Sequence, residues 1–130
     1  MVCYEDILVS FAHRLGGLDP DVLINITNDA WFGKTSEPYL HLNLSVMRSI
    51  ETHKSLLRST NTGVSAVIDP VGRLVASTGL DDMETVLEQV PMMTGVTVYQ
   101  RVGGIVAYLV VIWSVVAVFA RRRRKKGRAT

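Results

Sequence analysis

The chain is poor in cysteine, since Cys3 is the only one among its 130 residues. A single thiol excludes an intramolecular disulfide framework, so stability must come from a buried core, a membrane or a partner. Histidine is also scarce: only His13, His41 and His53 are present, and their spacing matches no common metal-binding pattern. The sequence therefore predicts no disulfide scaffold and no metal site, and it indicates no cofactor.

Basic residues are scarce everywhere except near the C-terminus. Positions 121–130 contain seven Lys and Arg and no acidic residue, whereas positions 1–102 contain seven basic and twelve acidic residues. The formal net charge of +2 is therefore an average over an acidic body and a basic tail. An acidic body argues against nucleic-acid binding.

Residues 103–120 contain no charge and read GGIVAYLVVIWSVVAVFA. As a helix this segment would extend roughly 27 Å, close to the ~30 Å hydrocarbon core of a bilayer. The basic residues at 121–130 favour a cytoplasmic C-terminus under the positive-inside rule. We therefore predict a transmembrane helix at 103–120, a basic cytoplasmic tail at 121–130 and an extracytoplasmic body at 1–102. A buried core helix with a solvated basic tail is the alternative, although such a helix normally has a polar face.

Apolar periodicity and turn residues divide the first part of the body into a helix, a strand and a loop. Apolar residues at helical spacing predict a helix over 5–15, which Gly16 and Gly17 end. The apolar run at 22–26 predicts a buried strand. A loop at 27–33 follows it, and in α/β sheets ligands bind at such carboxyl ends of strands.

The second part of the body predicts a long helix and a hairpin. Ser36 is a plausible N-cap for a helix that runs to about Leu57, and a break at 59–63 follows. One apolar stripe on this helix consists of Tyr39, Leu42, Val46, Ile50 and Leu57. Strands at 64–68 and 73–77 flank a turn whose residues suit type I. Residues 78–102 are predicted to be loop-like. These few strands make an incomplete α/β layer, so we expect the body to be part of a larger domain.

Cys3 stands in the sequence Val2-Cys3-Tyr4-Glu5, just ahead of the first predicted helix. The thiolate is the reactive form of cysteine, and a helix N-terminus stabilises it. Cys3 is therefore a candidate nucleophile, with a buried structural thiol as the alternative. Glu5 has a simpler interpretation as a first-turn acid favoured by the helix dipole. Tyr4 could serve packing alone.

Five motifs occur along the chain: CYE at 3–5, NDAWFG at 28–33, MRSIE at 47–51, RSTNTG at 58–63 and DPVG at 69–72. In order and spacing, together with His41 and the apolar segment with its basic end, they resemble the C-terminal part of the apolipoprotein N-acyltransferases. That family lies within the nitrilase, or carbon–nitrogen hydrolase, superfamily. The resemblance implies the C-terminal portion of a nitrilase-like α-β-β-α sandwich domain at 1–102, followed by the transmembrane helix.

The resemblance also implies a two-step acyl transfer. An acyl chain would move from a phospholipid to the thiol of Cys3 as a thioester, and then to the N-terminal amine of a diacylglyceryl-cysteine lipoprotein. In this reading the Tyr4 amide helps to hold the oxyanion, Glu5 shapes the site, and Trp31 contacts the acyl chain or acts as a lid. The implied location is the inner membrane of a bacterium, with the catalytic part on the periplasmic side.

The family's catalytic Glu and Lys come from regions upstream of the cysteine motif. We therefore expect a fragment that is inactive alone and whose partner is the N-terminal half of the same protein. Two other functions remain open. One is a membrane-tethered nitrilase-type amidase that passes its thioester to water. The other is a non-catalytic, single-pass membrane-anchored binding module.

Overall fold

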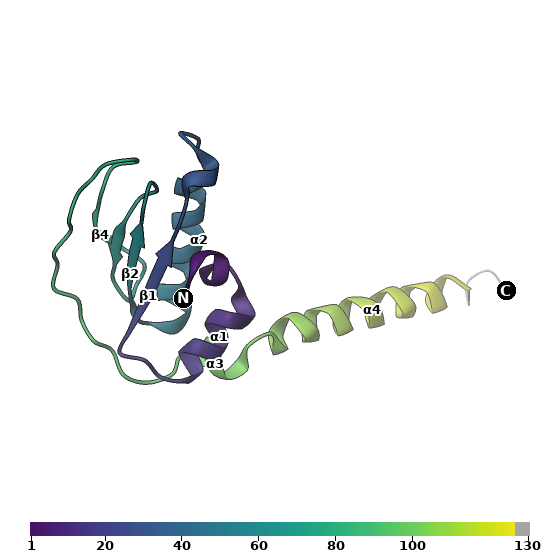
Figure 1. Ribbon diagram of the computed structural model, residues 1–130. Helices are drawn as coiled ribbons and strands as arrows, with labels where there is room; N and C mark the ends of the chain where they lie inside the picture. Colours follow the sequence, from purple (N-terminus) through teal and green to yellow (C-terminus); the bar gives the residue numbers. More distant parts are fainter. Residues whose placement is uncertain (127–130) are drawn as a thin grey trace.

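The computed structural model describes residues 1–126 and shows one four-stranded sheet with helices packed on one of its faces (Figure 1). The strands are β1 (Val22–Thr27), β2 (Ser55–Thr60), β3 (Ala66–Ile68) and β4 (Leu74–Ser77), in the order β1-β2-β3-β4. β1 and β2 are parallel, and the β2–β3 and β3–β4 pairs are antiparallel. The predicted α/β class is therefore confirmed.

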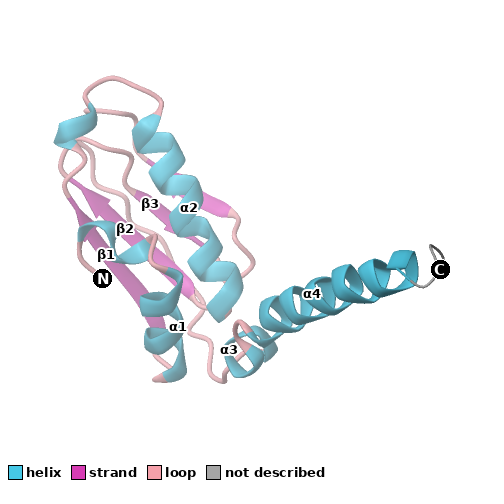
Figure 2. Ribbon diagram, turned by 90° about the vertical axis from the view of Figure 1, so that its right-hand side faces the viewer, coloured by secondary structure: helices cyan, strands magenta, loops and turns pink. Residues whose placement is uncertain are grey.

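Two long helices and several short ones accompany the sheet. They are η1 (Cys3–Asp6), α1 (Val9–Gly17), η2 (Ala30–Phe32), α2 (Glu37–Thr52), α3 (Val98–Val102) and α4 (Ile105–Lys126). α1 contacts η1, α2 and α3. α4 projects away from this body, as both ribbon views show (Figure 2).

The core lies between the sheet and α2. Leu23, Leu56 and Ile68 of three strands pack with Leu42 of α2, and each is at most 6% exposed. Side chains alternate along β1, so Leu23 faces the helices while Ile24, 51% exposed, lies on the other face. The described residues thus supply one helical layer and one sheet.

β1 and the hairpin agree with the sequence predictions. The Asp69 carbonyl accepts the Gly72 N–H at 3.0 Å, and the Asp69 carboxylate accepts the N–H groups of Val71 and Arg73. The first helix is divided, because a short 3₁₀ helix at Cys3–Asp6 precedes α1.

The prediction that the second helix runs to Leu57 is wrong. α2 ends at Thr52, and β2 occupies positions that were assigned to the helix and to the break after it. His53 adopts a left-handed conformation with φ 54°, and the Lys54 N–H bonds to the Ser49 carbonyl at 3.2 Å. After this cap the chain reverses and enters β2. Leu57 lies in β2, and its helical spacing from the apolar residues of α2 is a coincidence.

The transmembrane helix predicted at 103–120 is not found. Within the part of the chain that the structure describes, no helix is both long enough and apolar enough to cross a membrane. Gly103 takes a φ of 51° and separates α3 from α4, so α4 begins only at Ile105. The apolar part before Arg121 is shorter than predicted and extends about 24 Å at ~1.5 Å per residue. Of the predicted tail at 121–130, residues 127–130 lie outside the described part.

Candidate functional site

Cys3 lies at a corner between an extended segment and a helix. Val2 pairs in parallel with Ile26 of β1, and the Ile26 N–H donates to the Met1 carbonyl at 3.1 Å. The chain therefore reaches Cys3 along the free edge of β1. Cys3 itself adopts φ 53°, a left-handed conformation that is costly for a residue with a side chain. The sharp corner it forms leads directly into η1.

Two hydrogen bonds hold this corner in place. The Val2 N–H donates to the Glu5 carboxylate at 2.6 Å, and the Asn25 amide donates to the Cys3 carbonyl at 3.2 Å. Glu5 thus closes the first turn as a capping side chain does. Its predicted site-shaping role stays a prediction, because this contact fixes the backbone rather than a substrate.

An open cavity of about 470 Å³ lies beside the thiol. Cys3, Tyr4, Trp31 and Phe32 line it. The rings of Tyr4 and Phe32 meet edge-on at 6.1 Å between centroids, and Trp31 is 77% exposed. The structure therefore brings Cys3, Tyr4 and Trp31 together, whereas Glu5 does not line the cavity. An aromatic wall beside a thiol suits an apolar group attached to that thiol.

Tyr4 stacks on the ring of His41, with centroids 4.9 Å apart and planes 12° apart. Partial burial raises the pKa of the Tyr4 phenol above its ordinary value, and the nearby carboxylates of Glu37 and Asp29 act in the same direction. The hydroxyl therefore stays neutral at physiological pH and can donate a hydrogen bond.

Beneath Tyr4 lies a buried network of four charged or ionisable side chains, which we call the Asp6–Asp29 network. His41 places its Nε2 3.0 Å from Asp6 and its Nδ1 3.0 Å from Asp29. Arg58 donates to the second oxygen of Asp6 at 2.6 Å and to the second oxygen of Asp29 at 3.0 Å. Each carboxylate is therefore held by one nitrogen of His41 and one of Arg58.

No pattern in the sequence predicts a role for the members of this network. They come from η1, from the loop after β1, from α2 and from β2, so no local spacing connects them. The available signals are the NDAWFG and RSTNTG motifs, which contain Asp29 and Arg58, and His41, which is part of the family resemblance. Gly63 also belongs here, because a Cβ at that position would lie 2.3 Å from an oxygen of Asp29.

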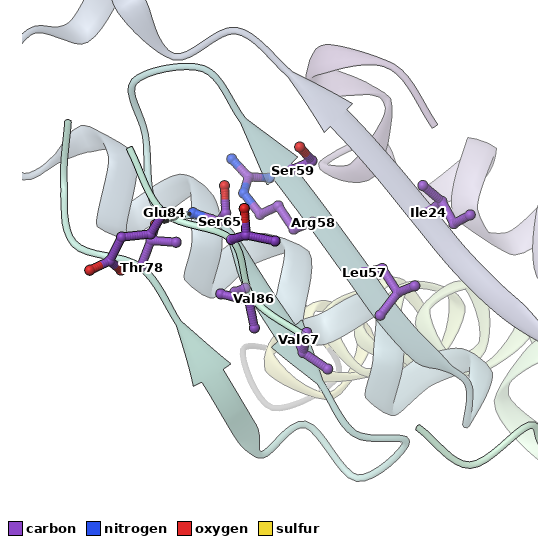
Figure 3. A pocket seen from close by; sticks show the side chains of 11 residues that line it. Ile24, Leu57, Arg58, Ser59, Ser65, Val67, Thr78, Glu84 and Val86 are labelled. Carbon is purple, nitrogen blue, oxygen red and sulfur yellow. Dashed lines mark hydrogen bonds between the residues drawn. The ribbon is translucent and has the colours of Figure 1, made fainter. Parts of the chain in front are cut away.

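A second cavity, of about 370 Å³, lies over the sheet and is not lined by Cys3. Ile24, Leu57 and Val67 form its floor across three strands, and the segment with Glu84 and Val86 borders it (Figure 3). It opens on the face opposite the core. Arg58 of the network also lines it, but it shares no lining residue with the cavity beside the thiol.

Comparison with known proteins agrees with this geometry. Residues 1–98 match the sequence pattern of the family described as carbon-nitrogen hydrolase. The chain belongs to that family. Among solved structures, a carbon-nitrogen hydrolase from Helicobacter pylori G27 superposes with a TM-score of 0.52 and 16% identity over 65% of this chain and 36% of that one. This likeness shows the nitrilase-like fold alone.

The chain is also homologous to the apolipoprotein N-acyltransferases. It is 44% identical over 124 residues to the one from Rhodopseudomonas palustris, with 95% of this chain and 23% of the relative covered. It is 46% identical over 127 residues to the one from Caulobacter vibrioides, with the same coverage of both chains. The family resemblance seen in the sequence is therefore confirmed. This chain spans about a quarter of the length of these relatives.

Proposed function

We propose that this chain supplies the nucleophile of an apolipoprotein N-acyltransferase. In this proposal Cys3 accepts an acyl chain from a phospholipid as a thioester and passes it to the N-terminal amine of a diacylglyceryl-cysteine lipoprotein. The observation that carries the proposal is the position of Cys3, at a strained corner beside the cavity formed with Tyr4, Trp31 and Phe32. Both substrates are lipid-borne, so the reaction belongs at the bacterial inner membrane, on its periplasmic side.

The chemistry divides between the thiol and the groups around it. The Cys3 thiolate attacks the ester carbonyl of the donor, the glycerol oxygen leaves with a proton, and a thioester remains. The amide of Tyr4 is the oxyanion donor in this proposal, and Trp31 contacts the acyl chain in the cavity. The amine of the acceptor then attacks the thioester, an amide bond forms, and the thiol is released.

We further propose that the general base Glu and the Lys of this reaction lie in a separate segment that covers the exposed face of the sheet. Ile24 and Ile26 are 51% and 60% exposed on that face, although strands of this kind are normally buried on both sides in α/β proteins. Glu5 is engaged with the Val2 backbone, and Lys54 is buried against Asp19, so neither is free to act beside Cys3.

A chimera tests the proposal. The matching quarter of the Rhodopseudomonas palustris relative is replaced by this chain, and N-acylation of a diacylglyceryl peptide is followed by mass spectrometry in phospholipid micelles. We expect transfer by the chimera, a trapped acyl group on Cys3 when acceptor is omitted, and neither product after Cys3→Ala. The conservative Cys3→Ser variant serves as the matched control for folding.

Other outcomes would support other functions. Release of free fatty acid or ammonia without amide formation would indicate an amidase that passes its thioester to water. A folded chimera that forms no adduct at Cys3 would reject the nucleophile and favour a binding module. For the 130-residue chain alone we expect no thioester, and a measurable adduct there would contradict the need for a second segment.

A further inference from the structure

The Asp6–Asp29 network poses a hydrogen-bonding problem at His41. Each ring nitrogen lies 3.0 Å from an oxygen of a different carboxylate. An ionised carboxylate only accepts hydrogen bonds, and a neutral imidazole has a single N–H. A neutral His41 between two carboxylates would therefore point a nitrogen lone pair at an oxygen lone pair.

The net charge of the network also indicates that it holds an additional proton. Asp6, Asp29, His41 and Arg58 are each at most 3% exposed. Two carboxylates and one guanidinium sum to a net negative charge, and an unpaired charge away from water is costly. One additional proton makes the network neutral. It can reside on the ring or on a carboxyl group.

The contacts of the carboxylates favour the ring. The Arg58 guanidinium donates to one oxygen of Asp6 and to one oxygen of Asp29, which also accepts from the Thr27 hydroxyl at 3.3 Å. Charge-assisted hydrogen bonds of this kind stabilise the ionised form of a carboxylate, which leaves the additional proton to the ring.

We propose that His41 is an imidazolium that bridges Asp6 and Asp29, and that this bridge positions Cys3 against its cavity. Asp6 is the last residue of η1, which begins at Cys3. Asp29 directly precedes η2, which contributes Trp31 and Phe32 to the cavity. The bridge thus ties together the two segments that form the cavity.

Two further contacts connect the His41 bridge to the backbone on either side of the Cys3 thiol. Tyr4 stacks on the His41 ring, so the residue after the nucleophile rests on the bridge itself. Arg58 also donates to the side-chain Oδ1 of Asn25 at 3.4 Å, and the side-chain Nδ2 of Asn25 donates to the Cys3 carbonyl. His41 is accordingly a positioning residue, because it acts through Tyr4, Asp6 and Asp29.

The protonation of the ring is tested first, on the full chain labelled with ¹⁵N. At neutral pH we expect both ring nitrogens of His41 to carry a proton, and the signature of one protonated nitrogen in the Asp6→Asn variant. A wild-type ring with one unprotonated nitrogen would overturn the imidazolium. This readout does not depend on catalysis, so it remains decisive even where the proposed acyl transfer fails.

The positioning of Cys3 is tested by the rate at which iodoacetamide alkylates it, and this part rests on the proposed role of Cys3. We expect Asp6→Asn to slow alkylation roughly tenfold, the size of one charge-assisted hydrogen bond. The matched control is Asp19→Asn, which removes a carboxylate that pairs with Lys54 outside the network, and we expect a change below about twofold.

Backbone spectra report whether each variant is folded. Where Asp6→Asn is unfolded, Asp29→Asn removes the other carboxylate of the bridge and takes its place. A folded bridge variant that is alkylated as fast as wild type would overturn the positioning role. A slowed variant together with an inactive chimera would retain the bridge and reject only the acyltransferase.

Discussion

At the scale of single residues, Gly63 packs tightly against Asp29 of the buried network. A Cβ at Gly63 would lie 2.3 Å from the Asp29 carboxylate oxygen and 2.9 Å from its Cβ. Asp29 cannot withdraw easily, because Arg58 and His41 hold both of its oxygens. We expect Gly63→Ala to lower the free energy of unfolding by about 1–3 kcal/mol, the usual cost of overpacking, measured by urea denaturation.

The control for this substitution is Gly17→Ala at the end of α1. A Cβ there would meet nothing within 4 Å, and the backbone is helical. We expect a change within about 0.5 kcal/mol, as for ordinary surface positions. Equal stability of the two variants would show that Asp29 moves freely, against the network described above.

A pH dependence is expected at Asp19. The Lys54 ammonium donates to it at 2.5 Å, and this hydrogen bond, with that from the Gly95 amide, holds the pKa of the carboxyl below its ordinary value of 3.8. Because the folded-state pKa is lowered, the stabilisation is fully present above that ordinary value and is lost as pH falls through the folded pKa. Asp19→Asn should therefore reduce stability at pH 6 to 7, and the difference from wild type should disappear in acid.

The measurement is the free energy of unfolding of both proteins between pH 7 and pH 2. Asn tolerates the left-handed backbone at this position, where φ is 51°, so the variant changes the charge without new strain. Asp21→Asn, an exposed carboxylate in the same turn, is the control and should leave the profile unchanged. A difference that persists at low pH would assign the effect to packing.

The residues at the Cys3 corner could be predicted from the sequence, whereas the Asp6–Asp29 network beneath them could not. Cys3, Tyr4 and Trp31 belong to motifs that can be read along the chain, and the structure places them around one cavity. His41 and Arg58 come together with Asp6 only when α2 and β2 pack over η1. A buried polar network assembled from four elements leaves no periodic signal in a sequence.

At the scale of elements, the prediction of which face of α2 is buried was wrong. The apolar stripe predicted a buried face with Tyr39 and Ile50, but these are 49% and 46% exposed. The buried face is largely polar and consists of Pro38, His41, Leu42, Ser45, Arg48, Ser49 and Thr52. Hydrophobic periodicity fails on such a helix, because its interior contacts are hydrogen bonds.

The boundary between α2 and β2 gives a prediction at this scale. His53 caps the helix at φ 54° and ψ 41°, a conformation that Gly adopts without steric cost. We expect His53→Gly to raise the thermal midpoint, by about 1 kcal/mol of stabilisation, and His53→Val to lower it. Calorimetry on both variants checks this. The reverse order would mean that the imidazole makes a contact that outweighs the backbone strain.

At the scale of the whole molecule, the sheet is covered by helices on one face, while Ile24, Ile26 and Leu57 lie on the other. This asymmetry agrees with a chain that spans about 23% of its relatives' length. The fold class and β1 could be predicted because their signals are local. The small number of strands also indicated an incomplete layer. Which face lacks its cover could not be predicted, since a strand that is apolar on both sides gives the same pattern whether or not a second layer is present.

The uncovered face leads to the last prediction. Replacing Ile24 and Ile26 together by Thr keeps the β-branched shape that suits a strand while removing exposed apolar surface. We expect the 130-residue chain to bind a hydrophobic dye such as ANS, partly on the exposed apolar residues of α4, and the double variant to bind less of it, with stability changed by at most about 1 kcal/mol. Leu23→Ala is the matched control on the opposite face. Because Leu23 is 4% exposed in the core, we expect it to cost about 2–5 kcal/mol. If the double variant binds the dye as well as wild type does, the dye binds to apolar surface elsewhere. The segment proposed to complete the thiol site would then need a different docking face.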